Sequence, residues 1–391
     1  MRTQVGIIGA GPAGLLLGQL LTQAGIANVV LEGRSHAYVE GRVRAGVLEQ
    51  GTVDALAEAG VDARLRAEGL QHDGIILRFD DHDHKIDVAA LTGKSIVVYG
   101  QQEVVRDLIA ARQADAAPLL FEATATALEG IEGASPVIRF THAGEAHALS
   151  CDWIAGCDGF HGLARASMPA DVLRVFERVY PFSWLGILAR APSKLDLVSY
   201  AHHPNGFALS SMRSPEVARL YLQCAPDEAV ADWPDDRIWD ELDARLTGGA
   251  GLHRGPVLQK GITPMRSFVA EPMRHGRLFL AGDAAHIVPP TGAKGMNLAV
   301  ADVRVLARAL AAHYAEGTDA LLDGYSTSCL DRVWKVTRFS WWMTSMLHNF
   351  PGAEPFDRRL QLAQLRYTVE SRAAAESLAE NYVGLPFAAS A

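Results

Sequence analysis

Apolar and polar positions at the start of the chain follow the order strand, turn, helix, strand. We predict an apolar strand over residues 4–8, a glycine-rich turn, a helix over 12–24 and a second apolar strand over 28–31. Pro12 suits the first helical turn, where its missing N–H is not needed, and Gly25 suits the end of the helix. This order is typical of the first β-α-β unit of a nucleotide-binding sheet.

The pattern changes further along the chain. Residues 74–79 and 85–88 predict a hairpin around a polar turn. Residues 95–99 predict a strand that leads into a helix starting near Gln102. Between 179 and 261 the pattern is period-two alternation, which predicts a second sheet with strands over 184–189, 207–212 and 218–223.

The last third of the chain returns to the first pattern. A buried strand is predicted over 277–281 and a helix over 296–314, and the remainder is helical. We therefore predict an α/β fold in which a Rossmann-type dinucleotide domain is interrupted by an α+β, sheet-based substrate domain and followed by a C-terminal helical region. The predicted limits are 1–178 for the first part, with the hairpin of 72–95 contributing to the substrate side, 179–265 for the substrate domain, 266–336 for the resumed part and 337–391 for the helical region.

Composition narrows the class of protein. The 391 residues suffice for two or three compact units, and 49% hydrophobic with 21% charged residues is ordinary for a globular protein. The net charge of −9 argues against a nucleic-acid partner but permits a small anionic ligand at a locally positive site. The four cysteines form no CxxC pair, so we expect a reduced, cytoplasmic setting and no structural metal. Glycines and a proline interrupt the apolar run at 5–21, so we interpret it as neither a signal peptide nor a membrane segment.

A glycine loop follows the first predicted strand. Gly9, Gly11 and Gly14 have the spacing GxGxxG. The first glycine makes the tight turn, the second lets the backbone approach a pyrophosphate, and the third allows the helix to pack close to the strand. Glu32, at the end of the next strand, is placed to accept hydrogen bonds from an adenosine ribose. The loop alone would match many turns, but strand, loop, helix and acid together predict a dinucleotide site.

Two aspartates favour FAD over NAD as the dinucleotide. Asp158 and Asp283 each end an apolar strand and are flanked by small residues. An aspartate in this position can reach a polyol chain that lies across the sheet, and FAD has such a chain in its ribitol. The alternative is that the aspartate only caps a helix. The glycine-rich segment 248–251 lacks a preceding strand, so a nicotinamide cofactor would have no Rossmann unit of its own.

Polar residues alternate on two predicted strands of the second domain. Ser211 and Arg213 share one face of the first strand, and Arg219 and Tyr221 share one face of its partner. If the two faces coincide, two guanidinium groups and two hydroxyls converge, which would suit the carboxylate of a benzoate. The alternative is a solvated polar sheet face with ordinary ion pairs.

The motifs of the chain resemble those of one enzyme family. The glycine loop, residues 157–159 (Cys-Asp-Gly) and 282–283 (Gly-Asp) together resemble the single-component flavoprotein aromatic hydroxylases. Segments 44–50 (RAGVLEQ), 289–295 (PPTGAKG) and 380–386 (ENYVGLP) narrow the resemblance to the 4-hydroxybenzoate 3-monooxygenase family, over essentially the whole chain. The resemblance implies a homodimeric enzyme that uses FAD, NAD(P)H and O₂ to convert 4-hydroxybenzoate into 3,4-dihydroxybenzoate, through a flavin C4a-hydroperoxide.

The resemblance also implies cofactor contacts. Besides the glycine loop and Glu32, it assigns to FAD the residues Arg42, Arg44, Gln102, Asp158, Arg219, Asp283, Lys294, Gly295 and Asn297. The helix after 289–292 would point its N-terminus at the flavin pyrimidine, where reduced flavin carries negative charge. The nicotinamide cofactor would contact Arg34, Tyr38, Arg42, His161 and Arg266. Studied family members have Arg and Gln where this chain has Gly33 and Arg34, so NADPH is expected and NADH stays open.

By the same resemblance, Ser211, Arg213 and Tyr221 bind the substrate carboxylate. Pro290, through its carbonyl, and Thr291 would lie beside the reacting ring.

The resemblance further implies a proton relay from the substrate hydroxyl to solvent. A phenol has a pKa of about 10 in water, so a site that works near neutrality must help to remove its proton. Tyr200, Tyr382 and His72 would form the relay, although none of them stands out without the resemblance. Val198, in the substrate pocket, replaces the usual leucine of the family and predicts some tolerance for a second ring hydroxyl.

Other interpretations remain open. The same chemistry could act on 3,4-dihydroxybenzoate or 4-aminobenzoate, and the rivals are a nicotinamide-dependent dehydrogenase and a non-catalytic flavin sensor. The acidic and histidine-rich run at 80–84 resembles a metal cluster, but its short polar residues suit a hairpin turn. The Trp341–Trp342 pair is interpreted as core or subunit interface.

Overall fold

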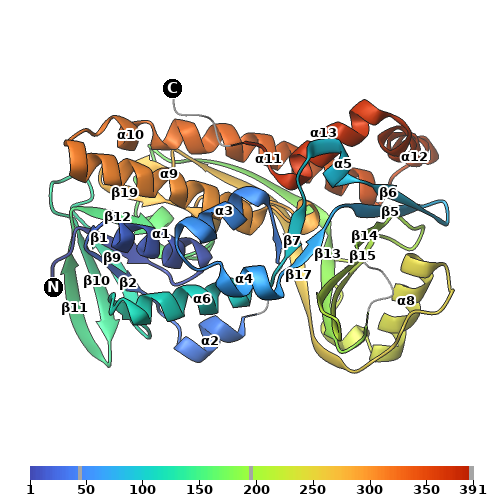
Figure 1. Cartoon of the computed structure of the whole chain (residues 1–391), viewed down its shortest axis with the longest axis horizontal. Coiled ribbons are helices and arrows are strands. Elements are labelled where there is room, and N and C mark those ends of the chain that lie inside the picture. Colours follow the sequence, from blue (N-terminus) through green and yellow to red (C-terminus); the bar gives the residue numbers. More distant parts are fainter. Residues whose placement is uncertain (43–45, 193–196, 387–391) are drawn as a thin grey trace.

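The structure of the chain is a computed structural model that describes residues 1–42, 46–192 and 197–386 (Figure 1). Two large sheets form its two halves, and a long helix near the top of the view runs over both. One sheet is mostly parallel and the other is mostly antiparallel. The predicted α/β class with an α+β second part is confirmed.

A six-stranded sheet forms the first half. Its strands are β1 (Val5–Ile8), β2 (Asn28–Leu31), β8 (Leu119–Leu120), β12 (Trp153–Gly156), β18 (Arg274–His275) and β19 (Leu278–Leu280). Their order across the sheet is β18-β19-β12-β1-β2-β8. β1 pairs in parallel with β2 and β12, and every residue of these three strands is buried, as expected for a parallel sheet covered on both faces.

Helices cover one face of this sheet and a small sheet covers the other. α1 (Pro12–Gln23) packs over Ile7 of β1 and contacts α6 (Gln101–Ala114) and α9 (Gly295–Glu316). On the opposite face Gly6 meets Ile138. This second layer is an antiparallel sheet of β9 (Thr124–Glu129), β10 (Val137–His142) and β11 (Glu145–Ser150).

An eight-stranded sheet forms the second half. Its strands are β5 (Ile75–Phe79), β6 (His82–Ile86), β13 (Arg174–Ala189), β14 (Val198–Ala201), β15 (Ala208–Ser214), β16 (Val217–Cys224), β17 (Val257–Glu271) and β20 (His286–Ile287). Their order is β20-β17-β13-β16-β15-β14-β5-β6. The β5–β6 hairpin extends the sheet beside β14. β13 and β17 pair along most of their length, and the predicted domain limits at 178 and 265 fall inside them.

The hairpin of β5 and β6 corrects one prediction. Asp80 and Asp81 both adopt left-handed backbone conformations, with φ of 50° and 61°, and form a two-residue turn. β6 therefore begins three residues earlier than predicted, and Val88, predicted to end the strand, begins α5 (Val88–Thr92), which is capped by the side chain of Asp87. The run at 80–84 is thus turn and strand, and no group of three or more metal-ligating side chains occurs in the described part of the chain.

The remaining elements connect or cover these sheets. A small sheet has the order β3 (Val47–Leu48), β7 (Ile96–Val98), β4 (Leu70–His72). The other short elements are α2 (His36–Gly41), α3 (Gln50–Glu58), α4 (Ala63–Glu68), α7 (Leu163–Ala166), η1 (Val230–Asp232), η2 (Gly282–Ala284) and η3 (Pro290–Gly292). The other helices are α8 (Asp235–Thr247), α10 (Ala320–Asp323), α11 (Tyr325–Leu347), α12 (Pro355–Glu370) and α13 (Arg372–Val383). Within the described ranges, every helix is too short or too polar to span a membrane.

Candidate functional site

The glycine loop after β1 has the geometry that its spacing predicts. Gly9 has a φ of +102°, which favours glycine, and a Cβ on Gly14 would collide with the carbonyl oxygen of Gly9. No atom of the described residues lies within 4 Å of the position of a Cβ on Gly11, so the backbone there is open to a ligand. No described side chain caps the start of α1, which leaves backbone amides available at this end.

Glu32 ties the end of β2 to the glycine loop. One carboxylate oxygen accepts a hydrogen bond from the amide of Ala10 at 2.8 Å, and the other accepts from the amide of Arg34 at 2.8 Å. Each oxygen retains a second lone pair. The half-buried carboxylate can therefore still accept a ribose hydroxyl, and that contact stays a prediction.

Asp158 and Asp283 follow two neighbouring strands, β12 and β19, at the same edge as the glycine loop. One oxygen of Asp158 accepts from the amide of Ala164 at 2.8 Å, so this aspartate does cap a helix, α7. Its other oxygen is buried and has no hydrogen-bond partner in the described structure. Burial raises the pKa of Asp158. Asp283 is exposed, directly after Gly282, whose φ is +62°.

The groups at this edge fit an FAD molecule. The open backbone at Gly11 fits a pyrophosphate, and the unpartnered oxygen of Asp158 can accept a hydroxyl. No described side chain caps α9 at Lys294, so the dipole of that helix can face negative charge on the flavin. Gln102 adds a buried side-chain oxygen with no partner among the described residues. Arg44 lies outside the described residues.

Glu49, which the sequence did not single out, engages two of the residues predicted to contact FAD. Lys294 donates to Glu49 Oε1 at 2.6 Å and to the carbonyl of Tyr382 at 2.9 Å. The Lys294–Glu49 pair is buried, and burial lowers the pKa of Lys294. Asn297 Oδ1 accepts from the amide of Glu49 at 3.0 Å and from the hydroxyl of Thr52 at 2.7 Å. Lys294 and Asn297 thus fix the start of α9, and their contact with FAD stays a prediction.

A second buried carboxylate lies behind the turn that presents Asp283. Asp302 Oδ2 accepts from the amide of Gly282 at 2.9 Å and contacts His286 Nε2 at 2.6 Å. Asp302 and His286 are almost fully buried. Burial opposes a charge on His286, but the carboxylate of Asp302 outweighs this effect and raises the pKa of His286. This pair therefore stabilises the Gly282–Asp283 turn.

The predicted carboxylate ligands share one face of the eight-stranded sheet. Ser211 lies opposite Arg219, and Leu209 lies opposite Tyr221, so the two polar faces coincide. Tyr200 lies opposite Leu209 and shares that face. The other face is apolar and packs against α8.

Arg213 is a cation that pairs with no carboxylate among the described residues of this face. Its Nη1 donates to Ser211 Oγ at 3.3 Å and to the carbonyl of Met212 at 3.1 Å, whereas its Nε is buried without a partner in the described structure. Burial and the nearby charge of Arg219 lower the pKa of Arg213 to about 10, and no described carboxylate opposes them. Arg219 Nε donates to the hydroxyl of Tyr221 at 3.2 Å.

Two small residues, Gly186 and Val198, leave room on this face. A Cβ on Gly186 of β13 would lie 2.8 Å from Arg219 Nη2 and 3.2 Å from the ring of Tyr221. Glycine is therefore the residue that lets both side chains lie flat across β13, a role that its sequence position did not reveal. Val198 is buried two residues before Tyr200, on the same side of β14.

Two of the three predicted relay residues meet. The hydroxyls of Tyr200 and Tyr382 are 2.6 Å apart and both side chains are buried. Burial raises the pKa of both phenols. His72 is buried and is the last residue of β4. The carbonyl of the next residue, Asp73, accepts a hydrogen bond from the amide of Ala89 in α5, and α5 packs on α13, the helix that holds Tyr382. The step from the tyrosines to His72 stays a prediction.

Thr291 and Pro290 lie in η3, next to α11. Thr291 is fully buried, and its hydroxyl oxygen is 2.9 Å from that of Thr344. Because Thr344 donates its own proton to the carbonyl of Ser340 at 2.7 Å, Thr291 is the donor of this pair. The carbonyl of Pro290 accepts from the amide of Ala293 at 2.9 Å and retains one lone pair.

The predicted nicotinamide contacts form two groups. His161 and Arg266 both lie against the ring of Phe160, with the His161 ring centroid at 5.0 Å and the guanidinium carbon at 4.7 Å from its centroid. The other three lie in or beside α2: Arg34, Tyr38 and Arg42. No described contact joins the two groups, and their shared role stays a prediction.

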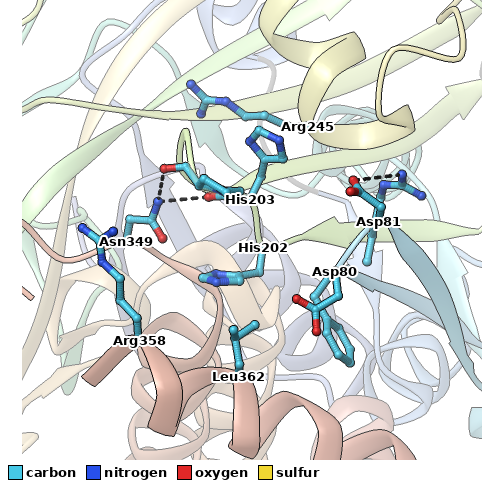
Figure 2. A pocket seen from close by; sticks show the side chains of 11 residues that line it. Asp80, Asp81, His202, His203, Arg245, Asn349, Arg358 and Leu362 are labelled. Atoms are coloured by element: carbon cyan, nitrogen blue, oxygen red, sulfur yellow. Dashed lines mark hydrogen bonds and ion pairs between the residues drawn. The ribbon is translucent and has the colours of Figure 1, made fainter. Parts of the chain in front are cut away.

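A cavity of about 310 Å³ lies apart from these groups (Figure 2). The turn of the β5–β6 hairpin, residues 202–204 after β14, and side chains of α8 and α12 line it. Three of its charged residues, Arg78, Asp80 and Arg245, already have ion-pair partners. None of the predicted site residues lines this cavity, so it does not correspond to the site described above.

Comparison with known proteins places the chain in a family. A family model described as FAD binding domain matches residues 2–340. The chain is 50% identical over 390 residues to p-hydroxybenzoate hydroxylase of Acinetobacter baylyi, which covers 99% of this chain and 96% of that protein. Its fold is similar to p-nitrophenol 4-monooxygenase of Pseudomonas putida DLL-E4, with a TM-score of 0.85, 20% identity and coverage of 98% and 99%. It is also similar to aklavinone-11 hydroxylase in complex with FAD and aklavinone, with a TM-score of 0.75, 22% identity and coverage of 91% and 72%. The resemblance seen in the motifs is confirmed, and the chain belongs to the FAD-binding family of flavoprotein aromatic hydroxylases.

Proposed function

We propose that this chain hydroxylates 4-hydroxybenzoate at C3. The substrate, O₂, NAD(P)H and a proton would give 3,4-dihydroxybenzoate, water and NAD(P)⁺. The observation that carries the proposal is Arg213, which lies on the sheet face that also holds Tyr200 and whose buried Nε has no partner among the described residues. An aromatic acid with a carboxylate at one end and a phenol at the other matches these two groups, and the 50% identical relative is a p-hydroxybenzoate hydroxylase.

The carboxylate is bound by Arg213, Ser211 and Tyr221. Because Nη1 of Arg213 already donates to Ser211 Oγ and a carbonyl, the edge formed by Nε and Nη2 is left for the carboxylate. Two parallel N–H donors match the two oxygens of a carboxylate. The buried cation gains its counter-ion only when the acid binds, which favours anionic aromatic substrates over neutral phenols.

The phenol proton is transferred through hydroxyls. The raised pKa values of Tyr200 and Tyr382 keep both side chains protonated near neutrality, so they relay a proton from one hydroxyl oxygen to the next and do not act as bases. An imidazole can exchange a proton with solvent near neutral pH, and we assign this last step to His72. Thr291 and the carbonyl of Pro290 border the ring.

FAD, when bound, supplies the redox and oxygen-transfer chemistry. The residues proposed to hold it are Gly9, Gly11, Gly14, Glu32, Arg42, Arg44, Gln102, Asp158, Arg219, Asp283, Lys294, Gly295 and Asn297. We further propose NADPH as the preferred donor, a homodimeric assembly, a cytoplasmic location and the four segments given above as domain limits. The uncapped start of α9 and the open backbone at Gly11 support the placement of the flavin and of the pyrophosphate.

The experiment that tests this function is NAD(P)H oxidation across a panel of substituted benzoates. We expect 4-hydroxybenzoate to stimulate oxidation strongly, with one 3,4-dihydroxybenzoate formed for each O₂ consumed. Benzoate and 4-hydroxybenzamide, which lack the phenol and the charge respectively, are the matched controls. A dehydrogenase would need no O₂, and a flavin sensor would show no stimulation by any acid. Either result would exclude the proposed function.

One observation favours a second substrate. Val198 replaces the usual leucine and is buried beside Tyr200, so the pocket gains about one methylene of space. We propose that 3,4-dihydroxybenzoate is also hydroxylated, more slowly, to a trihydroxybenzoate. Failure of 3,4-dihydroxybenzoate to stimulate NAD(P)H oxidation or to form this product would exclude it.

A further inference from the structure

His348 follows α11 and is fully buried. Its Nε2 accepts a hydrogen bond from the indole Nε1 of Trp184 at 2.7 Å, and its Nδ1 is 3.0 Å from the carbonyl oxygen of Thr344. An indole N–H can only donate and a carbonyl can only accept, so the imidazole carries its proton on Nδ1. Burial lowers the pKa of His348 to about 3, which keeps the imidazole neutral near neutral pH.

The imidazole is also held between aromatic rings. Phe182 and Phe207 stack on it, with centroid distances of 4.7 and 4.2 Å and interplanar angles of 8° and 21°. Trp184 in turn stacks on Phe207 at 5.0 Å and 13°. Because close-packed rings leave no space for another rotamer, the stacking and the two hydrogen bonds fix the same orientation of His348.

Trp184 carries this fixed geometry to the carboxylate end of the proposed site. Its ring centroid is 4.8 Å from that of Tyr221. Trp184 and Gly186 lie on the same face of β13, and Gly186 is opposite Tyr221. The indole of Trp184 therefore contacts one side of the Tyr221 ring, and Gly186, which has no side chain, leaves space beneath that ring.

The same end of α11 also reaches the ring end of the proposed site. Thr344, one helical turn before His348, accepts a hydrogen bond from Thr291 through its hydroxyl and from His348 through its carbonyl. A single helical turn is thus hydrogen-bonded to Thr291 on one side. On the other side His348 is hydrogen-bonded to Trp184, whose ring contacts that of Tyr221.

We propose that His348 is a positioning residue that sets the length of the aromatic acid. Through Trp184 it holds Tyr221 at a fixed distance from Thr291, so the site fits a carboxylate attached directly to the ring better than one on a longer arm. The inference rests on the proposed function, because it takes Tyr221 as a carboxylate ligand and Thr291 as a neighbour of the ring.

A double-mutant cycle tests it. His348→Phe keeps a stacked ring but leaves the indole N–H of Trp184 without an acceptor, Trp184→Phe removes the donor, and the double variant removes both polar groups. The control is His202→Phe, because His202 is a second histidine hydrogen-bonded to the end of α11, through the carbonyl of Leu347, but is only partly buried and does not bond to Trp184. Flavin absorbance titrations give the dissociation constants of 4-hydroxybenzoate and of 4-hydroxyphenylacetate, which is one methylene longer.

We expect His348→Phe to weaken 4-hydroxybenzoate binding by roughly 3- to 20-fold, with little change for 4-hydroxyphenylacetate, and the double variant to recover part of the loss. KM should change more than kcat, and His202→Phe should resemble the wild type. A merely structural role would weaken both acids equally and would show no recovery in the double variant, which would overturn the inference. If the wild type fails to bind 4-hydroxybenzoate, the proposed function and this inference both fall. Unchanged discrimination in variants of an active wild type overturns this inference alone.

Discussion

Replacing Arg213 by alanine removes the guanidinium group proposed to bind the substrate carboxylate, whose buried Nε has no partner among the described residues. A hydrogen bond to a charged group contributes about 1.5–3 kcal/mol. The Nε–Nη2 edge offers two such bonds, but the hydroxyls of Ser211 and Tyr221 remain in the variant and retain part of the carboxylate binding. We therefore expect a net loss of about one charged hydrogen bond, which weakens the binding of 4-hydroxybenzoate by about 10- to 100-fold.

The assay compares two ligands that differ only in charge. Dissociation constants of 4-hydroxybenzoate and of the neutral 4-hydroxybenzamide are measured by flavin absorbance titration in the wild type and in Arg213→Ala. The acid should lose affinity and the amide should lose little. Arg139→Ala is the control, because Arg139 forms an exposed ion pair with Glu129 on a different sheet.

Equal loss of affinity for both ligands would show that Arg213 only shapes the pocket. Unchanged affinity for the acid would show that Arg213 does not bind the carboxylate. Thermal unfolding without ligand gives a second test. Because Arg213 is a cation with no described counter-ion, its loss should leave the melting temperature unchanged or raise it, while the stabilisation by 4-hydroxybenzoate should shrink. A large drop in the melting temperature of the unliganded variant would contradict this account of the charge.

Four further predictions concern residues of the site. Tyr200→Phe breaks the 2.6 Å hydroxyl contact with Tyr382, so the variant should still oxidise NAD(P)H but release hydrogen peroxide, and full coupling in a peroxide assay would count against the relay. Asp302→Asn should weaken FAD binding about tenfold by fluorescence titration of the apoprotein, because the carboxylate holds both Gly282 and His286; a charge-assisted hydrogen bond of about 1.5–3 kcal/mol is lost. Since the pKa of His286 is raised in the folded state, its contribution to the free energy of unfolding is present below the ordinary histidine pKa and is lost as pH rises through the raised value. The melting temperature should therefore fall in alkaline buffer, and Asp302→Asn should lack this dependence; a wild type whose melting temperature does not change with pH would refute it. Val198→Leu should lower the turnover of 3,4-dihydroxybenzoate relative to 4-hydroxybenzoate by about fourfold, from about 0.8 kcal/mol for one methylene, and an unchanged product ratio would exclude Val198 as the cause.

Local sequence patterns predicted most of the elements around the site. The strand over 28–31 and the helix after Pro12 follow from short-range rules of apolar runs and helix ends. Alternation placed Ser211, Arg213, Arg219 and Tyr221 on strands before their register was known. The hairpin shows the limit of this reasoning. A polar turn was predicted over 80–84, but Asp80 and Asp81 alone form it and the residues after them belong to β6, because a polar run does not show which of its residues take left-handed conformations.

The buried charges could not be predicted in the same way. Lys294 and Glu49 form an ion pair across 245 positions of sequence, and no local pattern records such a distance. Without a packed structure, Lys294 is simply a basic residue near a helix start. Asp302 is likewise an acid among buried apolar residues of α9, and its contacts with the amide of Gly282 and the imidazole of His286 explain it.

The order of the strands along the chain has a consequence for how the chain folds during its synthesis. β1 and β12 leave the ribosome early. β19, which pairs with β12, is made only after seven of the eight strands of the larger sheet, since β20 alone follows it. Non-local parallel pairings form slowly, so the nascent nucleotide-binding sheet has an unpaired edge until residue 278 emerges. Completion of this sheet is therefore a late event, and Asp283 and the start of α9 become available to the flavin only after it. Supply of FAD is expected to assist the last stage of maturation and not the first.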